Sequence, residues 1–167
     1  DVTSNVSLAE AFEDAKRQAH LDSGTSLPNR TKLVAFMETA LASAAASMTV
    51  FYVDLDRFKP INDTHGHHVG DLVLGAVADR LRRAIRADHM VARVGGDEFV
   101  IAAPGMPAEA VERFCMKLME TVGAPIRHES GDLTVGMSIG VAIAPMDGTT
   151  LHELLRAADT ALYRSKQ

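Results

Sequence analysis

Residues 90–103 have the sequence MVARVGGDEFVIAA. Two apolar runs flank the pair Gly95 and Gly96 in this stretch, a pattern that predicts a β-hairpin. A two-residue turn of type I′ is expected there, because that turn requires a positive φ at both central positions and glycine adopts it readily. The acidic pair Asp97 and Glu98 follows directly after the predicted turn.

The segments on both sides of this hairpin predict the rest of the fold. Before it, residues 48–55 form a short apolar run typical of a central strand, and residues 69–85 have a helical apolar period. After it, we expect a helix that begins at Pro107 and a strand over residues 133–144. The order β-α-β-β-α-β is that of a ferredoxin-like, palm-like α+β fold. In this fold a mainly antiparallel sheet is backed by helices, and we expect one face of the sheet to stay open for a site.

Further helices are expected near the two ends of the chain. Residues 5–20 carry apolar positions at Leu8, Phe12, Ala15 and Ala19, separated by four, three and four residues. This narrow stripe fits either a two-helix seam or a helix that folds back on its own domain. A second helix is expected after an N-cap at Asn29, and a last one from about Leu151.

Composition excludes several classes of protein. The chain has 167 residues, enough for one domain, and its 17 basic and 22 acidic side chains leave a net charge of -5. That balance argues against nucleic-acid partners and against direct membrane contact, because both require a basic face. The single cysteine, Cys115, permits no disulfide framework, and no apolar run reaches the roughly 18 residues that span a bilayer. We therefore expect a cytoplasmic segment of a longer protein, which can itself be tethered to a membrane.

Carboxylates gather where the predicted central strand ends. Asp54 and Asp56 lie two residues apart, so both side chains point to the same side of the sheet. If the hairpin lies beside this strand, Asp54 meets at least one of Asp97 and Glu98, and a divalent cation between them would relieve the repulsion. Two such ions can clamp a phosphate and activate an attacking hydroxyl. Solvated aspartates at a strand end are the alternative.

The segment after the strand carries polar residues suited to a nucleotide. Lys59 offers a charge to phosphate, and Asn62 can both donate to and accept from a base edge. Asp71 can accept hydrogen bonds from the N1–H and N2–H groups of guanine, which adenine does not present. The alternative is that Asn62 closes a turn and Asp71 supplies the first turn of the next helix.

Together these motifs resemble the GGDEF family of diguanylate cyclases, over residues from about 22 to 166. The matching motifs are Thr25-Ser26-Leu27-Pro28-Asn29-Arg30, Asp54-Leu55-Asp56-Arg57-Phe58-Lys59, Asn62-Asp63, Gly66-His67, Gly70-Asp71, Arg93-Val94-Gly95-Gly96-Asp97-Glu98-Phe99, Ser138-Ile139-Gly140 and Ala158-Asp159-Thr160-Ala161-Leu162-Tyr163. The resemblance implies a linker helix over residues 1–20 and a GGDEF domain over residues 21–167. The family continues beyond its final lysine with a phosphate-binding arginine that is absent here, so weakened nucleotide binding is expected.

The resemblance also implies a reaction, in which two GTP molecules are condensed to cyclic di-GMP and two pyrophosphates by a homodimer. It implies a cofactor, Mg²⁺ or Mn²⁺, with two ions in each active site. The implied metal ligands are Asp54, the carbonyl of Leu55, Asp97 and Glu98, and the implied catalytic residues are Glu98, Asp97 and Lys59. The implied substrate-binding residues are Asn62 and Asp71 for guanine, and Lys59, Lys166, Phe58, Gly95 and Gly96 for the rest of the nucleotide.

Two further resemblances bear on regulation. The family often carries an inhibitory product site with the pattern R-x-x-D, and here Arg86 and Asp88 are present but His89 replaces the final aspartate. This departure argues against feedback inhibition, and a solvated helix end is the alternative. The late segments 123–126, 131–135 and 147–148 resemble GGDEF domains found beside an EAL phosphodiesterase domain. They imply an adjoining EAL domain, upstream sensory domains, and a rival function as a weakly catalytic, GTP-binding regulator of the phosphodiesterase.

Overall fold

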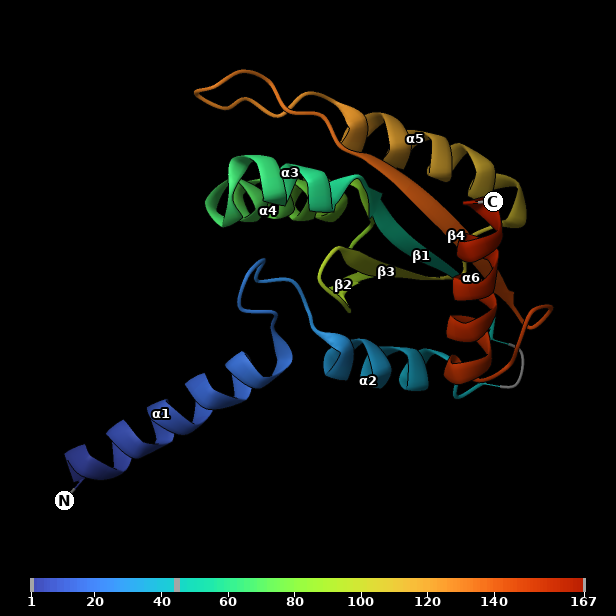
Figure 1. Ribbon diagram of the computed structural model, residues 1–167. Helices are drawn as coiled ribbons and strands as arrows, with labels where there is room; N and C mark the ends of the chain where they lie inside the picture. Colours follow the sequence, from blue (N-terminus) through green and yellow to red (C-terminus); the bar gives the residue numbers. More distant parts are fainter. Residues whose placement is uncertain (1, 44–45, 167) are drawn as a thin grey trace.

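The computed structural model describes residues 2–43 and 46–166, so the predicted end points, residues 1 and 167, lie outside the described residues. Figure 1 shows a single sheet with helices around it. Its strands are β1 (Met48–Asp56), β2 (Met90–Arg93), β3 (Glu98–Pro104) and β4 (Gly136–Ala144). They lie in the order β2-β3-β1-β4, and every neighbouring pair is antiparallel. The predicted ferredoxin-like α+β topology is thereby confirmed.

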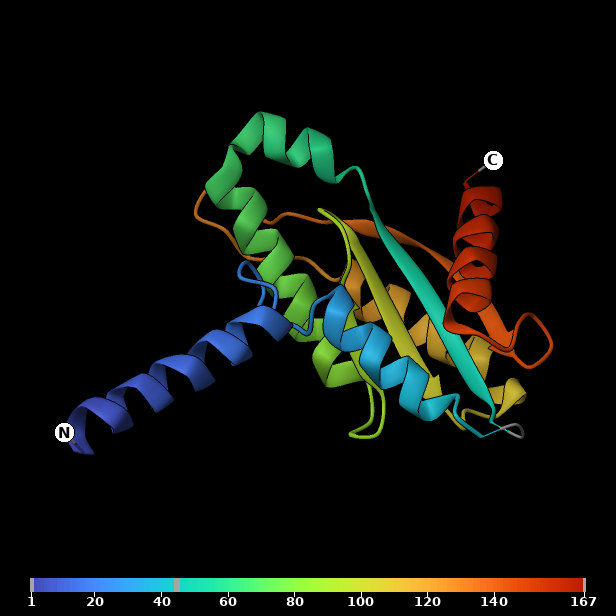
Figure 2. The ribbon, with the colours of Figure 1, turned by 90° about the horizontal axis from the view of Figure 1, so that it is seen from below.

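The helices include one that the sequence analysis did not predict. They are α1 (Val2–His20), α2 (Arg30–Ala40), α3 (Phe58–His65), α4 (His67–Ala84), α5 (Val111–Gly123) and α6 (Leu151–Ser165), with a short 3-10 turn at Ala108–Ala110 before α5. The unexpected helix is α3, which follows Arg57 in a left-handed backbone conformation with φ of 61°. Figure 2 shows α3 leaving the end of β1 and α4 returning along the sheet.

Both faces of the sheet are covered, so the expectation of an open face is wrong. Phe51, Val53 and Leu55 of β1 point into a core shared with α4 and α5. The alternate residues Val50 and Tyr52 point into a second core shared with α2 and α6. A strand that is apolar at every position must be buried on both faces, and α2 and α6 supply the second layer. The site is therefore confined to the end of the sheet.

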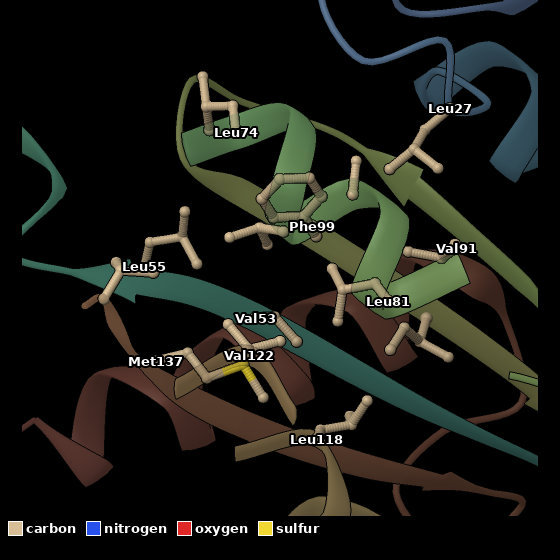
Figure 3. Close-up of a cluster of buried hydrophobic side chains, with 14 of the residues drawn as sticks. Leu27, Val53, Leu55, Leu74, Leu81, Val91, Phe99, Leu118, Val122 and Met137 are labelled. Carbon is tan, nitrogen blue, oxygen red and sulfur yellow. The ribbon is translucent and has the colours of Figure 1, made fainter. Parts of the chain in front are cut away.

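The larger core fixes the strand ends on which the acidic residues lie. Figure 3 shows Phe99 of β3 and Val53 of β1 beneath Leu74 and Leu81 of α4, and all four side chains are at most 5% exposed. Burial of a large apolar side chain stabilises a fold by about 1.5–3 kcal/mol. Asp54 directly follows Val53, and Glu98 directly precedes Phe99, so this packing positions both carboxylates.

The connection between β2 and β3 differs from the predicted turn. It covers residues 94–97, and neither Gly95 nor Gly96 has a φ between +20° and +160°, so the type I′ assignment is wrong. The backbone N–H of Val94 donates to the carbonyl of Glu98 at 3.0 Å. The guanidinium of Arg93 donates to the carbonyls of Gly95 at 3.1 Å and Gly96 at 2.8 Å. The Arg93 side chain therefore stabilises a loop conformation that differs from the two-residue turns expected for a glycine pair.

The first helix extends away from the sheet (Figures 1 and 2). Leu8 and Phe12 on its apolar stripe are 70% and 63% exposed, so the stripe is not folded back into the core of this domain. The predicted N-cap at Asn29 is confirmed, because its side chain accepts a hydrogen bond from the N–H of Lys32 at 3.1 Å. None of the helices in the described ranges combines the length and apolarity needed to cross a bilayer.

Candidate functional site

A pocket of about 580 Å³ lies where β1 ends. Its lining residues are Asp54, Leu55, Asp56, Arg57, Phe58, Lys59, Pro60, Asp97, Ser138 and Lys166. The chain turns sharply after β1 and runs directly into α3, which brings the strand end and the first turn of the helix to one rim. Six of the residues predicted for the site lie together here: Asp54, Leu55, Phe58, Lys59, Asp97 and Lys166.

The predicted adjacency of the central strand and the hairpin is confirmed. Asp54 of β1 lies directly opposite Glu98 of β3 in the antiparallel register. One residue further, the N–H of Leu55 donates to the carbonyl of Asp97 at 3.1 Å. These backbone bonds fix the two acidic segments side by side before any ligand binds.

The pocket brings three carboxylates close to three cationic side chains: Asp54, Asp56 and Asp97 against Arg57, Lys59 and Lys166. Burial, together with the charges of Asp54 and Glu98, raises the pKa of Asp97 above its usual value. The ammonium of Lys166 donates a hydrogen bond to Oδ2 of Asp54, and this bond raises the pKa of Lys166. The other oxygen of Asp54, Oδ1, is buried without a hydrogen-bond partner among the described residues. A buried carboxylate oxygen without a partner is costly, and a cation would relieve that cost.

The oxygen atoms at this pocket are suited to a magnesium ion that is also coordinated by the substrate. Asp54, the carbonyl of Leu55 and Asp97 offer hard oxygen ligands at one rim of the pocket. The described residues contain no ready cluster of three or more acidic, histidine or cysteine side chains for a metal. Magnesium suits such an incomplete set, because it commonly takes one or two carboxylates and completes its shell with phosphate oxygens and water.

Glu98 does not line this pocket, unlike the neighbouring Asp97. Its Oε2 accepts a hydrogen bond from the hydroxyl of Tyr52 at 2.9 Å. Burial, then the hydrogen bond to Glu98 and the charge of Glu98, raise the pKa of Tyr52 to about 12. A Cβ at Gly95 would lie 3.1–3.3 Å from side-chain atoms of Glu98, so a larger residue there would press on that side chain. Tyr52 is not among the residues predicted for the site, although its place two residues before Asp54 on the same strand face is a usable signal.

The two predicted guanine-binding residues lie on the helical pair beside the pocket. Asn62 is on α3, and its side-chain amide lies 3.2 Å from the Nδ1 of His67. Asn62 also packs so closely on Gly70 that a larger residue at position 70 would clash with it. Asp71 is exposed in the first turns of α4. Neither Asn62 nor Asp71 lines the pocket, to which α3 contributes Phe58, Lys59 and Pro60.

A polar connection that was not predicted from the sequence supports the loop over residues 94–97, the glycine loop. Arg93, which holds Gly95 and Gly96, also donates to Oδ2 of Asp22 at 3.0 Å. The same oxygen of Asp22 accepts from the backbone N–H of Thr25 at 2.8 Å and from its hydroxyl at 2.7 Å. The segment that follows α1 is therefore tied to the loop that presents Asp97.

A second cavity of about 440 Å³ lies at the far end of β3, where Pro104 leaves the sheet. Its charged lining residues are Arg83, Arg86, Asp88, Arg113 and Lys117, with His89 among them. The side chain of His89 is 6% exposed, and its Nδ1 has no hydrogen-bond partner among the described residues. Burial lowers the pKa of His89, and the nearby charge of Asp88 opposes that effect. The predicted regulatory residues Arg86 and Asp88 thus line one cationic cavity, separate from the first pocket.

Comparison with known proteins points to one protein family. A family model described as "Diguanylate cyclase, GGDEF domain" matches residues 19–167. The solved GGDEF domain of TpbB from Pseudomonas aeruginosa is 38% identical, with a TM-score of 0.83 over 88% of each chain. The coiled coil and GGDEF domain of DgcB from Caulobacter crescentus, solved in complex with c-di-GMP, is 30% identical, with a TM-score of 0.88 over 99% of this chain and 91% of that one.

Among curated proteins, the bifunctional diguanylate cyclase/cyclic di-GMP phosphodiesterase MucR of Pseudomonas aeruginosa is 39% identical over 164 residues. That match includes 96% of this chain and 24% of MucR. The diguanylate cyclase TpbB of the same species is 40% identical over 168 residues, which are 98% of this chain and 37% of TpbB. The chain therefore spans well under half the length of either relative.

Proposed function

The chain belongs to the GGDEF family of diguanylate cyclase domains, and on that premise we propose that it condenses two GTP molecules into cyclic di-GMP and two pyrophosphates. The observation that carries this proposal is the meeting of Asp54, the carbonyl of Leu55 and Asp97 with Lys59 and Lys166 in one pocket. Oxygen ligands for a metal and cations for a triphosphate are both required for phosphoryl transfer, and the pocket holds both.

Asp54, the carbonyl of Leu55 and Asp97 would hold the divalent metal, Mg²⁺ or Mn²⁺, as two ions in each site. When bound, these ions neutralise the triphosphate and lower the pKa of the attacking hydroxyl. Lys59 binds phosphate oxygens, and Lys166 exchanges its hydrogen bond with Asp54 for a contact to phosphate. In each transfer the 3′-oxygen of one GTP forms a bond to the α-phosphorus of the other. The bond from that phosphorus to the bridging oxygen breaks, pyrophosphate leaves, and a carboxylate, Glu98 or Asp97, takes the hydroxyl proton.

Helices α3 and α4 carry the residues that we propose select the base. The amide of Asn62 and the carboxylate of Asp71 can together satisfy the donor and acceptor edge of guanine. Phe58 lines the pocket together with Lys59 and Lys166, where it can pack against the nucleotide. Gly95 and Gly96 leave backbone without side chains next to the phosphates, and a Cβ at Gly96 would meet nothing within 4 Å, so that position has room for a ligand.

The reaction requires two copies of the domain. Each copy holds one GTP, and the product has two-fold symmetry, so an isologous homodimer is its natural catalyst. The exposed residues Leu8 and Phe12 on α1 offer a surface through which two copies can pair. Upstream sensory domains and an adjoining EAL domain remain predictions for the whole protein.

The second cavity is proposed as a weak product site. Arg83, Arg86, Arg113 and Lys117 supply charge for the phosphates of cyclic di-GMP. His89 stands where a carboxylate would accept hydrogen bonds from guanine, so we expect inhibition by the product to be weak.

The test is incubation of the protein with GTP and Mg²⁺ at several protein concentrations, followed by separation of the nucleotides. Cyclic di-GMP should form, with a specific activity that rises with protein concentration. Glu98→Gln should abolish turnover while the melting temperature stays near that of the wild type. Tight binding of GTP without any cyclic product would reject the cyclase and favour the regulatory alternative.

A further inference from the structure

We propose that Tyr52 is a positioning residue whose buried hydroxyl holds the carboxylate of Glu98 in the orientation that the reaction uses. The inference rests on the proposed function, since it assigns a partner to the carboxylate that serves the cyclase site. It concerns a residue inside the second core rather than one that lines the pocket.

The position of Tyr52 in the sheet explains why it can reach Glu98. Tyr52 and Asp54 lie two residues apart on β1, so their side chains leave the same face of the sheet. Asp54 pairs with Glu98 across the ladder, which makes Tyr52 a diagonal neighbour of Glu98. Diagonal neighbours are within reach of an aromatic side chain, and the hydroxyl lies 2.9 Å from Oε2.

The side chain of Glu98 depends on this contact for its orientation. Its backbone is fixed, because the N–H groups of Val94 and Gly95 both approach its carbonyl, at 3.0 and 3.4 Å. Its carboxylate has one hydrogen bond to the described residues, the bond from Tyr52. The ring of Tyr52 is itself only 8% exposed and packed in the core, so it is a rigid anchor for a side chain with several rotatable bonds.

The chemistry of the anchor suits a carboxylate that needs a fixed orientation. A phenolic hydroxyl donates a hydrogen bond without adding a positive charge, in contrast to the ammonium of Lys166 on Asp54. The bond involves Oε2 alone and leaves Oε1 outside it. Tyr52 can therefore orient Glu98 while one carboxylate oxygen stays available for a proton or a metal.

Tyr52→Phe tests this role in the full chain, because it removes the hydroxyl and keeps the ring. We expect kcat to fall about tenfold, on the scale of a hydrogen bond to a charged group, while KM for GTP stays within about twofold. Activity is measured at protein concentrations where the specific activity no longer rises. A change in dimerisation then does not affect the comparison of kcat values. Tyr163→Phe is the matched control, since Tyr163 on α6 is 66% exposed, and its kcat should equal that of the wild type.

A second measurement needs neither nucleotide nor metal. Urea unfolding is compared for the wild type, Tyr52→Phe, Glu98→Ala and the double variant. If the hydroxyl acts on Glu98, Tyr52→Phe lowers the unfolding midpoint in the wild-type background and has little effect in the Glu98→Ala background. Equal shifts in the two backgrounds, or an unchanged kcat in Tyr52→Phe, would overturn the proposal. A wild-type chain that makes no cyclic di-GMP would overturn the proposed function and the positioning role with it, while the urea data would still measure the contact.

Discussion

At the scale of single residues, two ion pairs of this domain lie in different surroundings and have different expected roles. Lys166 and Asp54 form a charged pair inside the proposed nucleotide pocket. Arg93 and Asp22 form another behind the glycine loop, where Thr25 adds two more hydrogen bonds to the same carboxylate oxygen. Under the proposed function the first pair opens when phosphate binds, whereas the second persists through the reaction. Substitutions in the two pairs should therefore affect different measurements.

The pair behind the loop leads to a prediction about stability and pH. Burial raises the pKa of Asp22, but the hydrogen bonds from Thr25 and Arg93 and the charge of Arg93 outweigh it, so the pKa is lowered overall. A lowered folded-state pKa adds stability above the unfolded value of about 3.9, and this contribution is lost as the pH falls through the folded value. Asp22→Asn should lose about 1–3 kcal/mol of unfolding free energy at pH 7. The difference from the wild type should shrink well below pH 4 in urea unfolding, whereas Asp132→Asn, in an exposed turn, should show no such trend.

The residue proposed to read guanine gives a prediction about selectivity. Asp71→Asn replaces an acceptor by a group that presents donors, so one of the two guanine N–H groups loses its partner. We expect the preference for GTP over ATP, measured as the ratio of kcat/KM values, to fall at least about tenfold. Asp79→Asn is the control, because Asp79 is an exposed residue of the same helix that pairs with Arg82. An unchanged preference for GTP in Asp71→Asn would contradict base recognition by Asp71. It would favour the alternative role, stabilisation of the first turn of α4.

At the scale of elements, the packing of α6 on β4 sets a strict size limit at one position. A Cβ at Gly140 would lie 2.8 Å from the Cβ of Leu162 and closer still to the backbone of α6. Gly140→Ala should therefore lose about 1–3 kcal/mol or more of unfolding free energy. Gly75→Ala is the matched control on α4, where a Cβ meets nothing within 4 Å, and it should gain about 0.5–1 kcal/mol from helix propensity. Urea unfolding of both variants measures the two shifts, and equal shifts would contradict this account of the packing.

The elements also explain what could be predicted from the sequence. Strand β1, the hairpin strands and helices α4 to α6 follow from apolar periods and turn residues, and the meeting of Asp54 with Asp97 follows from their order. Helix α3 was missed because its eight residues include a proline and few apolar positions, a segment too short for a helical period to emerge. The loop over residues 94–97 was predicted incorrectly because Arg93 binds its carbonyls, a tertiary contact that no local rule contains.

At the scale of the whole molecule, the covered sheet changes where the site can be. Because α2 and α6 bury the face that was expected to be open, the pocket lies at the strand ends and opens to solvent beside α3. A site at the strand ends can face a second copy of the domain, whereas a site covered by helices cannot. The same arrangement puts the cationic cavity at the opposite end of β3, so a ligand there would not compete directly for the pocket.

Pairing through the first helix gives the prediction that belongs to the whole molecule. Leu8→Glu combined with Phe12→Glu places two like charges on the exposed stripe of α1, which would repel across a seam between two copies. Specific activity should then fall at low protein concentration and recover partly at high concentration, while the melting temperature stays unchanged, because neither side chain is part of the core. Ala9→Glu adds a charge on the same helix beside the stripe and should leave the concentration dependence as it is. Sedimentation of the variants at the same concentrations separates the two cases, since a dimer that persists in the doubly substituted chain would assign the pairing surface to the domain itself.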